Sequence, residues 1–103
     1  MLTSKQRAQL RSMAASLDTI LQIGKGGVTD SVIGQTADAL RARELVKGRV
    51  LEASLLTARE ACDALAEACR AEGVQTIGNV FVLYKRNEKE PKIELVSERK
   101  KRK

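Results

Sequence analysis

Residues 20–30 read ILQIGKGGVTD, and this stretch decides how the chain is expected to fold. A short apolar segment, 20–23, has the length and β-branched content of a buried strand. Three glycines among residues 24–27 then make a turn. Val28 and Thr29 match the apolar residue and the N-cap that precede a helix. The stretch therefore predicts a strand, a glycine-rich turn and a helix in immediate succession.

The glycine-rich turn has the properties of an anion site. Glycines lack Cβ atoms, so a ligand can approach the backbone and the amides can turn inward. The following helix adds unpaired N–H groups and the positive end of its dipole beside Lys25. Glycine turns between a strand and a helix are also common in α/β domains for purely structural reasons. From this stretch alone, phosphate binding and a plain structural turn both stay open.

Helical periodicity occurs three times along the chain. Two of the helices begin with capping boxes, in which a threonine and a Glu or Gln three residues later satisfy each other's backbone amides. The pairs are Thr3 with Gln6 and Thr57 with Glu60. The expected helices cover 4–15, 30–43 and 57–73, and Gly73 is expected to end the last one.

The third expected helix has an apolar face and an acidic face. The stripe that it should bury consists of Ala61, Leu65, Ala68 and Cys69. Its outer face carries Glu60, Asp63 and Glu67, which would repel a polyanion, so this helix should lie away from one. Cys62 and Cys69 are about 10 Å apart along the helix axis, too far for a disulfide, and both are predicted to be reduced core thiols.

Alternating apolar residues predict three further strands. They cover 45–51, 74–77 and 80–84, the last two joined by the hairpin turn Gly78-Asn79. In the first of these strands, Lys47 and Arg49 share one face. Gly48 lies on the other face, where it indicates either a bulge or the close approach of another backbone. One face of the last strand should carry Val80, Val82 and Tyr84.

These elements follow the order α-β-α-β-α-β-β. The expected fold class is a two-layer α/β (α+β) domain with a four-stranded mixed sheet. Crossover helices make the first three strands parallel, and the hairpin makes the fourth antiparallel. Residues 1–86 are expected to form this one domain. Residues 87–103 are charged and contain a single proline, and they are expected to be a basic, mobile tail.

The net charge of +6 is spread unevenly along the 103 residues. Residues 1–50 carry +4, residues 51–84 carry −3 and residues 85–103 carry +5. One surface facing a polyanion would require such a distribution, although a solvated tail explains part of it. Aromatic residues make up only 2% of the chain, which argues against a platform that stacks bases. Backbone contacts should therefore dominate any RNA binding.

Composition leaves little for catalysis. The chain has no histidine, and two cysteines cannot by themselves complete a zinc site. Gly24, Gly26 and Thr29 approach the dinucleotide fingerprint, so a nucleotide-using enzyme is a second hypothesis. The third glycine is replaced by Thr29, however, and no lysine-then-Ser/Thr pair of the P-loop kind follows. We expect no enzyme activity, cofactor, metal or small-molecule substrate.

The remaining expectations concern partners and location. The acidic face of the third helix leaves a protein-interaction module open as a third hypothesis. The N-terminus lacks a basic-then-apolar signal pattern, and no apolar run approaches the length needed to cross a membrane. A cytoplasmic monomer without membrane contact is the expectation.

Four motifs together resemble one family. They are TSKQR at 3–7, GKGGVT at 24–29, ELVK at 44–47 and GNVFVLYKR at 78–86. In this order they resemble the chloroplast RNA splicing and ribosome maturation (CRM) domain family, in particular its stand-alone bacterial YhbY-type members, over about residues 2–96. The resemblance implies a fold like the C-terminal domain of translation initiation factor three. It also implies RNA binding through the G-x-x-G loop and association with ribosomal RNA of the large-subunit precursor.

The resemblance also carries over candidate RNA-binding residues by position. The loop residues are Gly24, Lys25, Gly26 and Gly27. The neighbouring basic residues are Lys5, Arg7, Arg11, Lys47, Arg49, Lys85 and Arg86. Thr29 in the loop and Arg41 at the edge of the second expected helix complete the candidate set. Gly48 departs from the branched residue usual in the family, which leaves the placement of Arg49 open.

Overall fold

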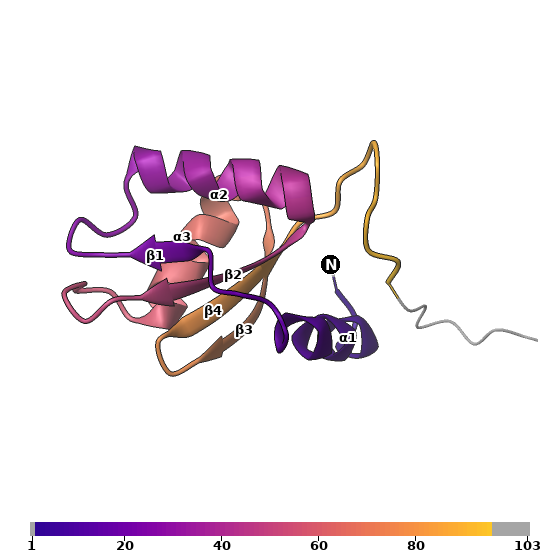
Figure 1. The fold of residues 1–103 in the computed structure, drawn as a ribbon, viewed down its shortest axis with the longest axis horizontal. Helices are drawn as coiled ribbons and strands as arrows, with labels where there is room; N and C mark the ends of the chain where they lie inside the picture. The colour runs from indigo at the N-terminus through magenta and orange to yellow at the C-terminus, as the bar shows by residue number, and fades with distance from the viewer. Residues whose placement is uncertain (1, 96–103) are drawn as a thin grey trace, which may run out of the picture.

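The computed structural model describes residues 2–95 of the chain. Seven elements follow one another there in the predicted order, which confirms the fold class (Figure 1). The helices of this part are α1 (Ser4–Ala14), α2 (Asp30–Arg43) and α3 (Ala58–Cys69). Its strands are β1 (Leu21–Ile23), β2 (Leu45–Val50), β3 (Glu72–Ile77) and β4 (Val80–Tyr84). The predicted bounds of α2 and β4 are confirmed, α1 and β2 end one residue early, and β1 begins one residue late.

The strands form one mixed sheet in the order β1-β2-β4-β3. β1 pairs parallel with β2, and β4 pairs antiparallel with both β2 and β3. The strand directions predicted from the crossover helices and the hairpin are therefore confirmed. Gly78 makes the hairpin turn with a φ of 59°, a conformation that favours glycine. The β1–α2 loop, the β2–α3 loop and the β3–β4 turn consequently lie at the same end of the sheet, which we call the loop end (Figure 1).

Alternate strand residues supply two cores on opposite faces of the sheet. On one face, α2 and α3 cover a cluster that includes the fully buried Phe81 and Leu83. On the other face, α1 packs against Val82 and Tyr84, as predicted for that side of β4. Because α1 is a single short helix, it covers this second face only in part. At the loop end of the second face, Ile77 remains 63% exposed.

Hydrogen bonds confirm the predicted helix starts. Both capping boxes are present, at the start of α1 and at the start of α3. Thr29 accepts a hydrogen bond from the amide of Val32 at 3.2 Å and so caps α2. Each such cap contributes about 1 kcal/mol to stability. The cap on α2 also sets the point at which the glycine-rich turn gives way to the helix.

The end of α3 differs from the prediction. Its last residue is Cys69, and Arg70 takes the left-handed conformation, with a φ of 57°, that terminates the helix. Gly73 lies within β3 and not at the end of α3, so its predicted role as a helix end is wrong. A Cβ at Gly73 would be 3.2 Å from Sγ of Cys62. Ala68 is exposed and not part of the core stripe. Cys62 and Cys69 are buried free thiols, as predicted.

The ring of Phe81 explains why residue 48 is a glycine. The residue pairs with Phe81 in regular register, and a Cβ at this position would lie 2.4 Å from Cζ of the Phe81 ring. The predicted alternatives, a bulge or a second backbone at Gly48, are therefore both wrong, because a buried ring fills the space. The irregularity lies in β3 instead, where Gly73 and Gln75 pair with successive residues of β4.

Glu44 holds the C-terminal segment. The residue connects α2 to β2 with a φ of 66°. Its buried carboxylate accepts hydrogen bonds from the amides of Asn87 (2.6 Å), Lys92 (2.8 Å) and Ile93 (2.7 Å). Burial alone would raise the pKa of Glu44, but these three donors and the charge of Arg86 together hold the pKa below its ordinary value. Glu44 therefore stays ionised at neutral pH.

Residues 87–95 contact the domain, whereas the sequence predicts a mobile tail from residue 87 onward. In addition to the contacts with Glu44, Ile93 and Leu95 pack beside the α1 core. The side-chain amide of Gln9 donates to the carbonyl of Glu94 at 2.9 Å. The sequence conceals these partners because they lie more than forty residues away along the chain. The basic run 99–103 lies outside the described residues.

Candidate nucleic-acid interface

The 24–27 turn presents an exposed tip. The amide of Gly27 donates to the carbonyl of Gly24 at 3.0 Å and closes the turn. Lys25 and Gly26 are exposed at the tip. Gly27 has a φ of 73°, whereas Gly26 has no positive φ. A Cβ on Gly26 would only touch the Thr29 methyl at 3.6 Å, so this position could carry a side chain without strain.

The β2–α3 loop packs against the 24–27 turn on the side away from its exposed tip. A Cβ on Gly24 would lie 3.9 Å from Cδ1 of Leu51, and one on Gly27 would lie 3.7 Å from Cδ1 of Leu56. Both distances are ordinary van der Waals contacts. The turn thus rests on aliphatic side chains of the neighbouring loop, while its tip faces solvent. This arrangement gives a ligand access to the tip.

The first turn of α2 contributes amides and one opposing charge. Helix geometry leaves the earliest N–H groups of α2 without intrahelical partners, and Thr29 satisfies the one on Val32. Asp30 stands in the same first turn. Its carboxylate already interacts favourably with the helix dipole and would repel a second anion. The tip with Lys25 is therefore the more favourable place for a phosphate.

Arg49 lies between this turn and the rest of the sheet. It is exposed and opposite Gln22 of β1 on one side and Val80 of β4 on the other. Ile77 of β3 continues the row beyond Val80. Because residues in register on neighbouring strands share a face, these four side chains cross the uncovered part of the sheet together. This register places Arg49, whose position the sequence left open, on the exposed face of β2.

Two predicted site residues make contacts that support the fold. The guanidinium of Arg7 donates to the carbonyl of Gly73 and joins α1 to β3. Nζ of Lys47 donates to the carbonyls of Ala14 (3.2 Å) and Leu17 (3.4 Å). The first acceptor is the last carbonyl of α1 and the second lies just after the helix, so this cation complements the dipole of α1. Sequence spacing could not reveal either role, because the acceptors are backbone carbonyls distant in the sequence.

Four other predicted basic residues are remote from the turn. Arg41 pairs with Asp38 on the exposed side of α2. Lys85 and Arg86 follow β4 and lie beside the start of β2, at the end of the sheet opposite the loop end. Lys5 is exposed in the first turn of α1, whose Gln6 borders the same cleft as Lys85. The structure thus divides the predicted basic set between the two ends of the sheet.

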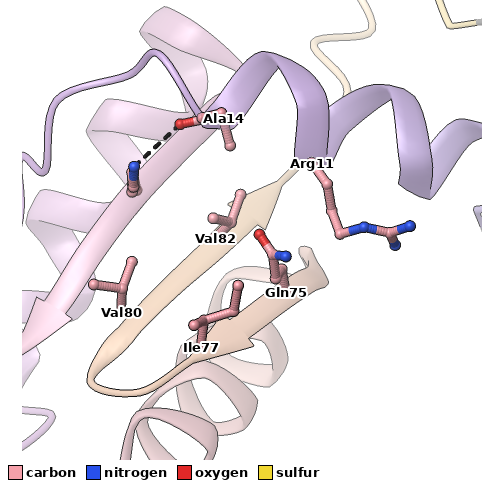
Figure 2. Close-up of a pocket in the computed structure, with 8 residues that line it drawn as sticks. Arg11, Ala14, Gln75, Ile77, Val80 and Val82 are labelled. Atoms are coloured by element: carbon pink, nitrogen blue, oxygen red, sulfur yellow. Dashed lines mark hydrogen bonds between the residues drawn. The ribbon is translucent and has the colours of Figure 1, made fainter.

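Arg11 belongs to the loop-end group. It lies on the last turn of α1 at the rim of a cavity whose lining includes Gln75 and Ile77 (Figure 2). Neither Gln75 nor Ile77 was singled out from the sequence. Their position depends on the bulge in β3, for which the sequence carries no distinct signal.

The aromatic side chains are buried, whereas the acidic side chains on the outer face of α3 are exposed. Phe81 and Tyr84, the aromatic residues of the chain, are both buried, which agrees with the expectation that no aromatic platform stacks bases. Glu60, Asp63 and Glu67 are exposed on α3, as predicted. Within residues 2–95, no group of three His, Cys, Asp or Glu side chains could hold a metal ion. No helix of that part has both the length and the apolar character to cross a membrane.

The sheet order argues against a dinucleotide site at the 24–27 turn. Dinucleotides bind in a crevice where strand order reverses within a parallel sheet. β1 is an edge strand here, and its neighbour β2 is followed in the sheet by the antiparallel β4. Thr29 stands where the fingerprint has its third glycine, and its hydroxyl caps α2 by accepting a hydrogen bond from the amide of Val32.

Comparisons with known proteins give one consistent result. The model of the CRS1 / YhbY (CRM) domain family matches residues 2–85. The Bacillus subtilis (strain 168) protein named "Probable RNA-binding protein YqeI" is 48% identical over 95 residues, covering 92% of this chain and 99% of that protein. A Haemophilus influenzae protein named "RNA-binding protein" is 35% identical over 94 residues, which cover 91% of this chain and 94% of that protein. The solution structure of a hypothetical protein from Staphylococcus aureus, 44% identical, matches with a TM-score of 0.78 over 93% of this chain and 100% of that one.

Proposed function

Because the chain belongs to the CRS1 / YhbY (CRM) domain family, we propose that it binds RNA and that its 24–27 turn contacts the phosphate backbone. The names of the relatives support RNA as the partner. The observation that carries the role of the turn is its exposed tip, where Lys25 and Gly26 project beyond the contacts with Leu51 and Leu56. The proposed function is binding without catalysis.

The basic residues divide into three proposed roles. Lys25, Arg49 and Arg11, on or near the loop end, contact RNA directly. Arg7 and Lys47 act indirectly, because their hydrogen bonds hold α1 against the sheet. The residues at the opposite end meet a more distant part of the same RNA: Lys5, Arg41, Lys85 and Arg86. Phosphate contacts of this kind position a protein on RNA and favour shape over sequence.

The proposed target is ribosomal RNA of the large-subunit precursor, in the cytoplasm. Its support is the family resemblance of the four motifs. Crosslinking in cells followed by sequencing of the bound RNA tests it. Enrichment of large-subunit ribosomal RNA is the expected result, and a set of bound RNAs without ribosomal RNA would contradict this target while leaving RNA binding intact.

The role of the turn is tested with two variants and one control. Gly26→Asp places a carboxylate at the exposed tip and should abolish RNA binding. The backbone tolerates this change, since a Cβ there meets only the Thr29 methyl at 3.6 Å, so thermal unfolding should be nearly unchanged. Lys25→Ala removes one charge-assisted hydrogen bond of about 1.5–3 kcal/mol and should weaken binding about tenfold or more.

Arg59→Ala is the matched control because it removes the same charge from the exposed surface of α3. Fluorescence anisotropy with a labelled ribosomal RNA fragment should show the control within about twofold of the wild type. Wild-type affinity in a folded Gly26→Asp protein would refute the role of the turn. Equal losses from Arg59→Ala and Lys25→Ala would indicate non-specific charge attraction instead.

A further inference from the structure

A cavity of about 360 Å³ lies between the last turn of α1 and the part of the sheet that α1 leaves uncovered (Figure 2). Its floor is aliphatic and consists of Ile77, Val80 and Val82. Sites for small ligands have volumes of roughly 300–1,000 Å³, so the space suffices for a flat ring system. Ile77 is 63% exposed, more than any other large apolar side chain in the described strands.

The bulge in β3 places a polar group beside this floor. Val74 is buried under α1, and the next residue, Gln75, pairs with Val82 on the same face of the sheet. A bulge allows two successive residues to face one side in this way. Figure 2 shows the carboxamide of Gln75 between Ile77 and Arg11. It offers both a hydrogen-bond acceptor and two donors at the edge of the apolar floor.

The charge around the cavity favours an anionic partner. Arg11 and Lys47 line it, and among residues 2–95 no acidic residue does. The guanidinium of Arg11 stands at the rim and turns outward (Figure 2). Nζ of Lys47, in contrast, donates to the carbonyl of Ala14 at the end of α1 and to that of Leu17 just after the helix. Ile77 and Val80 also belong to the cross-strand row that contains Arg49 and Gln22. At about 4.8 Å between strands, this row extends about 14 Å from β1, which leads directly into the 24–27 turn.

We propose that this cavity accepts one unpaired nucleobase of the RNA that the 24–27 turn holds. The faces of a base are apolar and fit the floor of Ile77 and Val80. Its edge carries donors and acceptors that match the Gln75 carboxamide, and its phosphate would lie near Arg11. This inference rests on the proposed RNA-binding function. It adds a preference for RNA with unpaired nucleotides, which phosphate contacts alone would not give.

The experiment compares two RNA probes of equal length. One is a hairpin with a loop of randomised nucleotides, and the other is a continuous duplex with the same number of phosphates. Wild-type protein should bind the hairpin more tightly. Ile77→Ala and Gln75→Ala should each reduce hairpin binding about fivefold and leave duplex binding within twofold. A fivefold loss is about the effect of one hydrogen bond, or of one to two of the three carbon atoms that Ile77→Ala removes being buried by the base.

Leu55→Ala is the control, because Leu55 is a 93% exposed apolar side chain outside the cavity. It should leave the hairpin-to-duplex ratio unchanged. Gly26→Asp should abolish binding of both probes, which separates failure of the turn from failure of the cavity. In methyl NMR spectra, the Ile77 and Val80 signals should shift with the hairpin and not with the duplex.

Two binding results would overturn the proposal. They are equal affinity of the wild type for both probes, and a hairpin-to-duplex ratio that is unchanged in Ile77→Ala, whether or not both affinities fall. Methyl signals that respond to neither RNA would also overturn it and would favour an apolar protein segment as the occupant. Thermal unfolding of each variant confirms folding, which the exposure of Ile77 favours.

Discussion

Replacing Gly48 with alanine should destabilise the fold more than adding a methyl group at any of the four other glycines that lack a positive φ. The new Cβ would lie 2.4, 2.7 and 3.0 Å from three ring carbons of Phe81. The ring is fully buried, so it can move only by displacing its neighbours in the core. Overpacking of this kind costs about 1–3 kcal/mol, and removing a glycine from a strand returns up to about 1 kcal/mol. Because the three contacts with the ring are 3.0 Å or shorter, the cost should lie at the upper end of its range, about 3 kcal/mol, and the expected net loss is about 2 kcal/mol.

Thermal unfolding measures this loss. For a domain of this size, 1 kcal/mol shifts the melting temperature by about 4–8 °C, so Gly48→Ala should melt about 8–16 °C below the wild type. Gly34→Ala is the matched control, because a Cβ on this exposed residue of α2 would meet no heavy atom within 4 Å. The same chemical change should there stabilise the protein by about 0.5–1 kcal/mol.

A second substitution tests the cause. Phe81→Leu shortens the side chain that fills the space over Gly48, so it should destabilise the wild type but cost much less in the Gly48→Ala background. A coupling of at least about 1 kcal/mol is expected from the double-mutant cycle. Two results would refute the reasoning: a Gly48→Ala protein that melts within 2 °C of the wild type, or strictly additive effects.

Three further outcomes follow from the structure. Glu44→Gln should weaken the attachment of residues 87–95 by about 1–3 kcal/mol, because the side-chain NH₂ group of glutamine would face a backbone N–H that now donates to a carboxylate oxygen. Faster hydrogen exchange at the amides of Lys92 and Ile93 would measure this loss. Since folding lowers the pKa of Glu44 below its ordinary 4.5, the stabilisation is complete above that pH and disappears as the pH falls through the folded pKa. The wild type and Glu44→Gln should therefore converge in acid, and a gap that widens there would contradict this. RNA affinity should fall about 10³-fold or more between about 50 and 200 mM salt if six or more phosphates are contacted, whereas a flat salt response would exclude phosphate contacts as the main term. Deleting residues 96–103, with their five consecutive basic residues, should lower affinity for the hairpin and duplex probes alike, and a changed ratio would show that this segment distinguishes between RNAs.

Local signals made most of the fold predictable. The capping boxes, the alternation of Val80, Val82 and Tyr84, and the Gly78-Asn79 hairpin each depend on residues a few positions apart, and each is confirmed. Contacts between distant residues could not be predicted. Gly48 and Phe81 are thirty-three positions apart, and nothing local indicates that a ring fills the glycine's space.

The same distinction between local signals and distant contacts applies to the candidate site. The exposed tip of the 24–27 turn could be located from sequence, because three glycines and a following helix cap have a local pattern. The roles of Arg7 and Lys47 could not, because a basic residue in a sequence carries no sign of whether its charge meets a carbonyl or solvent. Gln75 was missed because a one-residue bulge changes which face a side chain occupies.

The attachment of residues 87–95 has a practical consequence for handling this protein. Leu2 and Leu95 pack against the same cluster beside α1, so both ends of the described chain lie at the end of the sheet opposite the 24–27 turn (Figure 1). A fluorophore, an affinity tag or a sensor surface attached at residue 2 or residue 95 would therefore lie away from the turn. A short peptide could also join these two ends, with new termini opened at the exposed Gly78-Asn79 hairpin, to give a circular permutant that keeps α1 against the sheet.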